Sequence, residues 1–174
     1  EIGTSAPAFS LEDPDGTVHA LRDGASAHLV MFICNHCPFV KHVADELAAI
    51  GRDYLPRDVD IVAINSNDID AYPADAPAAM REEAKARGYT FPYVLDADQS
   101  VAKAYRAACT PDFFLFGPER TLVYRGRFDG SRPNSGIPVT GADLRAAVDA
   151  VLAGEPVPAK QYPSMGCSIK WRAQ

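Results

Sequence analysis

Residues 32–39 read FICNHCPF and place a Cys-x-x-Cys pair between an apolar run and the start of a helical pattern. Before the pair, residues 29–33 are continuously apolar, which predicts a strand covered on both faces. After it, apolar residues recur at spacings of three and four over residues 39–50, which predicts an amphipathic helix closed by Gly51. The two cysteines are therefore expected at the junction of a buried strand and a helix N-terminus.

This position favours thiol chemistry. At a helix N-terminus, unsatisfied backbone N–H groups and the positive end of the helix dipole stabilise an anion. The thiolate is the nucleophilic form of cysteine, so one thiol of Cys34 and Cys37 can attack a disulfide while the other resolves the mixed disulfide. A protonated His36, which lies between them, would favour the thiolate further and make the pair more oxidising.

The proline after the second cysteine distinguishes the two thiols. Pro38 lacks an N–H and is favoured at the first helical position, so Cys37 is predicted to be the N-cap, with its sulfur facing the free N–H groups of the first turn. The apolar strand runs to Ile33 and leaves no connecting residue before Cys34. We therefore predict that Cys37 has the lower pKa and attacks first, and that Cys34 resolves.

A Cys-x-x-Cys also occurs in zinc sites and in haem attachment sites. A zinc site usually has four ligands. Cys109 and Cys167 do not form a second Cys-x-x-Cys, and His42 would add only one ligand. Haem attachment needs His directly after the second cysteine, where this chain has Pro38. The sequence therefore favours redox chemistry, which requires no cofactor and no metal. The alternative to an enzyme is a non-catalytic or metal-binding module on the same fold.

The rest of the chain predicts an α/β protein with a mixed sheet. A turn cluster at residues 13–16 predicts an N-terminal hairpin, and the apolar run at residues 59–64 completes a β-α-β unit with a parallel strand pair. Further helices are expected from about 78 to 87, from a cap at Asp98 to residue 105, and from a capping box at residues 140–143 to Gly154. Residues 113–116 and 122–127 predict a second hairpin, and the proline-containing last twenty residues an irregular tail.

Composition limits the classes of partner. A chain of 174 residues with 47% hydrophobic and 23% charged residues predicts one domain over residues 1–174. A net charge of −6 without a dense Lys/Arg run argues against nucleic acid and membrane surfaces, and no apolar stretch approaches the roughly 20 residues that span a bilayer. No basic start followed by an apolar run marks a signal peptide, so we expect a cytoplasmic protein, although a chain opening at Glu1 rather than Met leaves the compartment open.

A second motif, ACTPDFF at residues 108–114, puts Pro111 directly before a strand, where a cis peptide bond can form a tight connection. Together with the Cys-x-x-Cys, the opening Gly-x-x-Ala-Pro-x-Phe at residues 3–9 and the tail GCSIKW at residues 166–171, this motif resembles the thioredoxin superfamily, most closely its peroxiredoxin-like (alkyl hydroperoxide reductase / thiol-specific antioxidant) branch. The resemblance implies a thioredoxin-like fold, a central mixed sheet of four to five strands flanked by helices. It also implies that a cis-proline loop, Thr110–Pro111, faces the thiols.

The chain departs from the peroxidases of this branch, which carry Pro-x-x-x-Thr/Ser-x-x-Cys and a distant arginine. If Cys37 is the reactive cysteine, Val30 and Cys34 take the Pro and Thr positions, and no arginine precedes the Phe-Phe strand. The resemblance therefore implies thiol–disulfide exchange with protein or small-molecule disulfides and thiols, regenerated by a reducing partner such as a thioredoxin-type system. Weak antioxidant peroxidase activity through Cys37 is the alternative.

Two further cysteines remain. Cys109 lies two residues from Pro111 and is expected near the Cys-x-x-Cys, and Cys167 lies on a tail long enough to fold back. We consider two hypotheses. In the first, Cys167 pairs with Cys109 or relays oxidation from the primary pair. In the second, both are buried, reduced thiols, as free cysteines commonly are.

Overall fold

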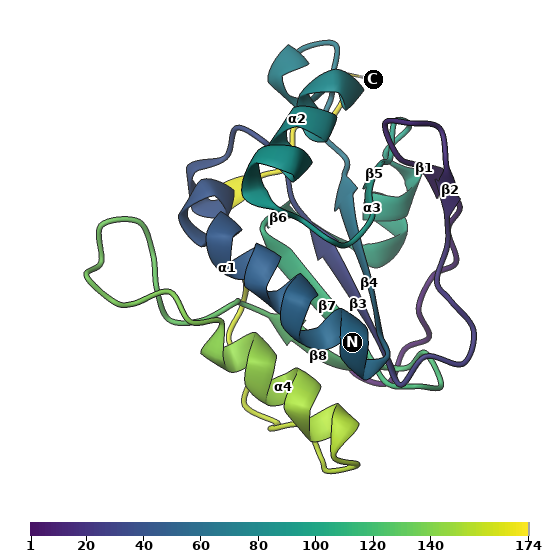
Figure 1. The fold of residues 1–174 in the computed structure, drawn as a ribbon, viewed down its shortest axis with the longest axis vertical. Helices are drawn as coiled ribbons and strands as arrows, with labels where there is room; N and C mark the ends of the chain where they lie inside the picture. Colours follow the sequence, from purple (N-terminus) through teal and green to yellow (C-terminus); the bar gives the residue numbers. More distant parts are fainter. Residues whose placement is uncertain (174) are drawn as a thin grey trace.

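The strand before the Cys-x-x-Cys lies at the centre of a seven-stranded mixed sheet in the computed structural model, which describes residues 1–173 (Figure 1). This strand, β3 (Ala27–Phe32), is buried along its whole length, as its continuous apolar run predicts. It pairs in parallel with β4 (Val59–Asn65) and antiparallel with β7 (Asp112–Phe116). The sheet order is β2-β1-β5-β4-β3-β7-β8, where the remaining strands are β1 (Leu11–Glu12), β2 (Val18–His19), β5 (Tyr93–Leu95) and β8 (Leu122–Gly126).

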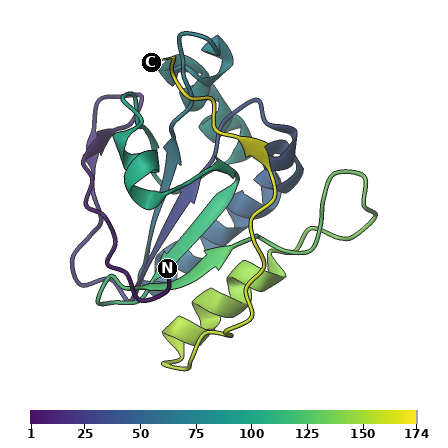
Figure 2. The ribbon, with the colours of Figure 1, turned by 180° about the vertical axis from the view of Figure 1, so that it is seen from behind.

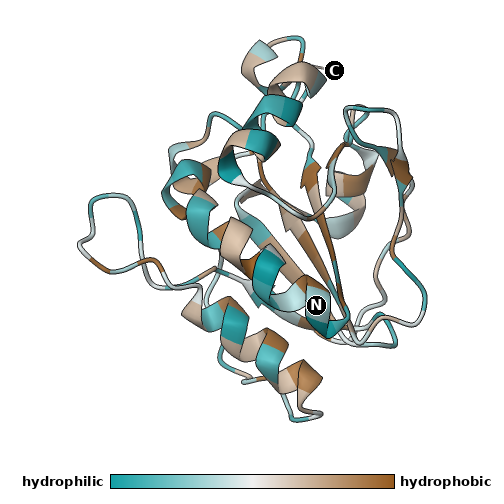
Figure 3. Ribbon diagram, viewed as in Figure 1, coloured by the Kyte–Doolittle hydropathy of each residue, from teal (hydrophilic) through white to brown (hydrophobic). Residues whose placement is uncertain are grey.

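Helices cover both faces of the sheet. Because side chains alternate along a strand, Leu29 and Met31 of β3 join one core cluster, whereas Val30 and Phe32 join the other. The first cluster packs under α1 (Pro38–Tyr54) and α4 (Ala142–Leu152), and the second under α3 (Ser100–Tyr105) (Figures 1 and 2). Figure 3 shows hydrophobic residues along the central strands, whereas α2 (Pro77–Arg87) is largely hydrophilic. No helix within residues 1–173 has the length and apolar character needed to cross a membrane.

The predicted end of the first helix is wrong. α1 continues through Gly51 to Tyr54 and is followed by a short 3-10 turn, η1 (Leu55–Arg57). Gly51 is buried, and a Cβ there would lie 2.6 Å from Thr90 Oγ1 and 3.1 Å from the Phe91 ring. This glycine therefore serves close packing of the helix rather than helix termination. α2 does end as predicted, at Gly88 with a φ of 74°.

Two predicted helix caps form only in part. Asp98 accepts the N–H of Ser100, the first residue of α3, at 3.0 Å, whereas the carboxylate of Asp96 accepts the next two N–H groups, those of Val101 and Ala102. At α4, the Thr140 hydroxyl accepts the N–H of Ala142, the first residue of the helix, at 3.2 Å. The predicted capping box of α4 does not form, because Asp143 pairs with Arg127 at 2.6 Å and the Thr140 N–H donates to Asp129 instead. β5, with only three residues, was not predicted, since so short a run shows no alternation.

The tail is irregular over most of its length, as predicted, but it contains one strand. β9 (Cys167–Ser168) pairs antiparallel with β6 (Cys109–Thr110), and the two form a separate two-stranded sheet. Figure 2 shows the tail running from α4 across the molecule to this strand. The end of the chain is thereby brought next to the segment that precedes β7.

Candidate active site

The two cysteines of the Cys-x-x-Cys lie at the junction predicted from the sequence. Cys37 is the N-cap of α1, with an extended backbone (φ −72°, ψ 125°) and Pro38 in the first turn. Cys34 lies between the end of β3 and this cap. Both side chains are buried, with exposed fractions of 2% for Cys34 and 0% for Cys37. All four cysteines of the chain are free thiols in this structure.

Thr110 contacts both cysteines. The Thr110–Pro111 peptide bond is cis. The hydroxyl of Thr110 lies 3.6 Å from Cys34 Sγ, and the thiol of Cys37 donates a hydrogen bond of 3.4 Å to the Thr110 carbonyl. The loop that was expected to face the thiols therefore does so through Thr110.

The surroundings separate the acidities of the two thiols. A hydrogen bond from Cys34 lowers the pKa of Cys37 below its usual range, against the effect of burial, and Cys167, the Val40 N–H and Thr110 lower it further. No capping hydrogen bond of standard geometry joins the Cys37 side chain to α1 in the described structure. The same contact with Cys37, together with burial and the negative charge of Asp75, raises the pKa of Cys34. Cys37 is therefore the better thiolate and Cys34 the better proton donor.

A buried carboxylate beside the site, Asp75, was missed by the sequence analysis. It lies in the 3-10 turn η2 (Pro73–Asp75) and is completely buried. Its oxygens accept hydrogen bonds from the Asn35 N–H at 2.8 Å and from the Asn67 amide at 3.0 Å. Aspartate in a polar segment between a strand and a helix reads as a solvated loop residue, so the sequence carried no signal for it.

His36 faces this carboxylate. Its Nδ1 lies 2.6 Å from Asp75 Oδ2, and its ring stacks on Tyr72 with centroids 5.5 Å apart. His36, which the sequence analysis expected to act on the thiol pair, therefore contacts Asp75. Donor atoms of Cys34, His36 and Asp75 lie within 4.8 Å of one another and would supply three of the four ligands of a zinc ion. His42, considered as a ligand from the sequence, instead contacts Ser131 at 3.1 Å.

Cys109 and Cys167 differ in their surroundings although their strands pair. The thiol of Cys109 points to the Pro111 carbonyl at 3.8 Å, and burial raises its pKa to about 12. Cys167 lies opposite Thr110 and packs against the core cluster that contains both thiols of the Cys-x-x-Cys. The side-chain contact described for Cys109 is therefore with Pro111, whereas Cys167, which the sequence analysis placed on a tail able to fold back, packs against the cluster of the primary pair.

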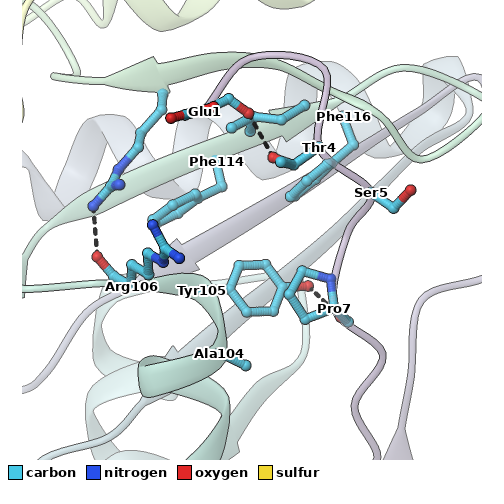
Figure 4. Close-up of a pocket in the computed structure, with 11 residues that line it drawn as sticks. Glu1, Thr4, Ser5, Pro7, Ala104, Tyr105, Arg106, Phe114 and Phe116 are labelled. Carbon is cyan, nitrogen blue, oxygen red and sulfur yellow. Dashed lines mark hydrogen bonds between the residues drawn. The ribbon is translucent and has the colours of Figure 1, made fainter.

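A small cavity of about 20 Å³ beside the Cys-x-x-Cys is lined by Phe39 and Pro111 among others, and two larger cavities lie away from the thiols. One of about 340 Å³ is enclosed by the N-terminal segment, α3, β7 and β8, with Tyr105 and Phe114 on its walls and the Tyr105 hydroxyl bonded to the Pro7 carbonyl at 2.8 Å (Figure 4). A second, of about 530 Å³, is lined by Cys109, Asp112 and Arg125 among others. Neither Cys34 nor Cys37 is among the described residues that line these two cavities.

The chain matches one family model and one curated protein. Residues 2–125 match the model of the AhpC/TSA family. The chain is 30% identical over 122 residues to the thiol-disulfide oxidoreductase ResA of Bacillus subtilis (strain 168), a match that covers 70% of this chain and 64% of ResA. It therefore spans less than two thirds of the length of this curated relative.

Solved structures extend the comparison. The crystal structure of a hypothetical protein from Sinorhizobium meliloti 1021 is 53% identical, with a TM-score of 0.98 over 100% of this chain and 96% of that one. The thioredoxin domain of a thiol-disulfide oxidoreductase from Bacteroides vulgatus is 18% identical, with a TM-score of 0.61 over 72% of this chain and 87% of that one. The latter likeness concerns the fold alone, and it confirms the expected thioredoxin-like architecture.

Proposed function

The chain belongs to the AhpC/TSA family, as its motifs indicated, and we propose that it is a thiol–disulfide oxidoreductase acting through Cys34 and Cys37. The observation that carries this proposal is the position of the two thiols, with Cys37 as the N-cap of α1 and both sulfurs in contact with Thr110, which precedes the cis proline. The opposite directions of the two pKa shifts agree with a thiolate nucleophile and a protonated resolving thiol. The similarity to ResA, which is named for this activity, supports it.

In the proposed reaction, the Cys37 thiolate attacks one sulfur of a substrate disulfide. The substrate S–S bond breaks, one substrate sulfur leaves as a thiolate, and a mixed disulfide with Cys37 forms. Cys34 then loses its proton and attacks Cys37 Sγ, which releases the second substrate thiolate and leaves a Cys34–Cys37 disulfide. Asp75 and His36 have polar atoms within 4.8 Å of the Cys34 sulfur and can receive that proton. An external dithiol, from a reducing partner such as a thioredoxin-type system, returns the two electrons.

Exchange of each cysteine for serine tests the two roles. We expect Cys34→Ser to keep a thiol that iodoacetamide alkylates rapidly at neutral pH. Cys34→Ser/Cys167→Ser, in which neither of these two neighbouring thiols can resolve the intermediate, should accumulate mixed disulfides with a disulfide substrate such as insulin. Cys37→Ser should do neither, and Cys109→Ser should behave like the unchanged protein. If Cys37→Ser keeps the rapidly alkylated thiol, then Cys34 is the nucleophile. If neither variant affects insulin reduction by dithiothreitol, the proposed activity itself is wrong.

A peroxidase activity is the second candidate, and the family match favours it. Here the Cys37 thiolate attacks a peroxide oxygen, an alcohol or water leaves, and Cys34 condenses with the resulting sulfenic acid to a disulfide with loss of water. Because Val30 and Cys34 occupy positions where the peroxidases of this branch carry Pro and Thr, we expect this reaction to be slower than disulfide exchange. Peroxide consumption with dithiothreitol, compared with Cys37→Ser, measures it. Peroxide turnover faster than insulin reduction would make the peroxidase the principal activity.

A further inference from the structure

The tail of the chain covers the thiol pair. The backbone of Gly166 packs so closely on Thr110 that a Cβ at residue 166 would collide with the Thr110 carbonyl. Beyond β9, the Ile169 N–H donates to the Ala108 carbonyl at 3.0 Å, and Ile169 is buried. The Gln99 amide donates to the Lys170 carbonyl, also at 3.0 Å. The tail is thus a docked element that lies over the segment in contact with Cys34 and Cys37.

The docked tail places Cys167 next to the residue that contacts Cys37. In the β6–β9 register Cys167 is paired directly with Thr110, and directly opposed residues of an antiparallel pair lie about 4.5–5.5 Å apart at Cα. The carbonyl of that same Thr110 accepts the hydrogen bond from Cys37. Cys167 also packs against the core cluster that contains Cys37. The neighbouring Cys167 helps to lower the pKa of Cys37, whereas burial and then Cys37 raise the pKa of Cys167.

Access distinguishes Cys167 from the primary pair. Cys34 and Cys37 are 2% and 0% exposed, whereas Cys167 is only partly buried. Thiol–disulfide exchange requires the attacking sulfur to reach the disulfide directly. A disulfide that includes Cys167 is therefore easier for a partner protein to attack than one between Cys34 and Cys37.

We propose that Cys167 is a third redox-active cysteine, which exchanges the buried Cys34–Cys37 disulfide for a Cys37–Cys167 disulfide that is accessible at the surface. The Cys167 thiolate attacks Cys37 Sγ of the Cys34–Cys37 disulfide, so that a Cys37–Cys167 bond forms and Cys34 leaves as a thiolate. Cys34 gains the proton that Cys167 lost, and no electron leaves the protein. A partner dithiol then reduces the Cys37–Cys167 disulfide by attack at Cys167. This step rests on the proposed disulfide exchange, which supplies the oxidised pair.

Disulfide mapping in a Cys34→Ser background tests the proposal. After treatment of the whole protein with oxidised glutathione, we expect the major product to be an intramolecular Cys37–Cys167 disulfide, found by mass spectrometry of non-reduced peptides. Cys34→Ser/Cys167→Ser should instead hold glutathione on Cys37. The matched control, Cys34→Ser/Cys109→Ser, should still form the Cys37–Cys167 bond. Glutathione on Cys37 without that bond in Cys34→Ser would overturn the proposal.

Kinetics separate this proposal from the function on which it rests. We expect Cys167→Ser to slow reduction of the oxidised protein by a thioredoxin severalfold, but to leave its reduction by dithiothreitol, a small dithiol, nearly unchanged. Cys167→Ala provides a second substitution, and circular dichroism establishes that both variants are folded. Equal rates with thioredoxin would count against the relay while leaving disulfide exchange intact. Retention of insulin reduction by Cys37→Ser would contradict the exchange function itself.

Discussion

At the scale of single residues, the two cysteines differ because of what surrounds each sulfur. The Cys34 thiol, the first-turn N–H groups of α1 and the Thr110 hydroxyl lie around Cys37, and these favour the anion despite complete burial. Cys34 has Asp75 nearby, and this negative charge favours the protonated form. The proposed division of roles between nucleophile and resolving thiol therefore rests on local charge and hydrogen bonding.

The contribution of Cys34 to the acidity of Cys37 can be measured. Cys34→Ser retains a hydroxyl that can donate to Cys37, whereas Cys34→Ala removes the donor. A hydrogen bond to a charged group contributes about 1.5 kcal/mol, which corresponds to about one pH unit. We therefore expect the alkylation rate of Cys37 to fall in acid at a midpoint about one pH unit lower in Cys34→Ser than in Cys34→Ala. Equal midpoints would show that this hydrogen bond does not set the pKa.

Asp75→Asn should affect both stability and acidity. The substitution removes one acceptor oxygen from a buried network, so we expect the free energy of unfolding in urea to fall by about 1–3 kcal/mol. It also removes the charge that raises the pKa of Cys34, so Cys34 should be alkylated at lower pH in a Cys37→Ala background. Asp15→Asn, on an exposed carboxylate paired with Arg81, is the control and should change stability by less than about 1 kcal/mol. If Asp75→Asn leaves the pH dependence of Cys34 alkylation unchanged, then Asp75 does not influence the pKa of Cys34.

At the scale of secondary-structure elements, the short pair of β6 and β9 contains Thr110, which contacts both thiols of the Cys-x-x-Cys. Two residues on each strand make few hydrogen bonds of their own, so the pair depends on contacts outside it. Those contacts come from Gln99, Ile169 and the close approach of Gly166 to Thr110. The tail strand is therefore an element that a single substitution can displace.

Gly166→Ala should separate the tail from β6. Its Cβ would meet the Thr110 carbonyl, which belongs to the backbone and cannot rotate away. We expect faster iodoacetamide labelling of Cys34 and Cys37 in the reduced protein and earlier proteolytic cleavage in the tail. Gly117→Ala is the matched control, because its Cβ would make an ordinary contact, 4.0 Å from Val123. Labelling at the unchanged rate in Gly166→Ala would show that the tail does not restrict access.

At the scale of the whole molecule, the two candidate disulfides of Cys37 would constrain the chain very differently. A Cys34–Cys37 bond closes a loop of four residues, whereas a Cys37–Cys167 bond closes one of about 130 residues. In the chain-entropy model these loops correspond to about 2 and about 5 kcal/mol of stabilisation. The larger loop would join the sheet and its tail covalently.

Oxidised Cys34→Ser should therefore be the more strongly stabilised form. We expect its urea midpoint, relative to the same variant reduced, to rise more than the midpoint of the unchanged protein rises on forming its Cys34–Cys37 disulfide. Denaturation followed by tryptophan fluorescence, with the linkage verified by peptide mapping, measures both shifts. A smaller rise in the variant would mean that the tail bond strains the native structure.

Much of the architecture was predictable because it follows from local patterns. Continuous apolar runs identified β3 and β4, a helical period identified α1, and Pro38 identified Cys37 as the cap. The predicted caps of α3 and α4 were incomplete, because Asp98 and Thr140 each accept one N–H group while Asp96 and Asp129, outside the expected motifs, supply further acceptors. Where several nearby polar groups compete for the same N–H, a local motif does not decide which one accepts.

The sequence by itself determined that two thiols stand at a strand–helix junction, because strand, turn and helix signals are all contained within about ten residues of Cys34 and Cys37. Only the tertiary structure decided which distant groups meet them. Asp75 lies 38 residues after Cys37 and Cys167 lies 130 residues after it, and their positions depend on how the intervening strands pair and on how the tail packs. Periodicity and caps describe short-range preferences, whereas these contacts are selected by packing and hydrogen bonding over the whole chain.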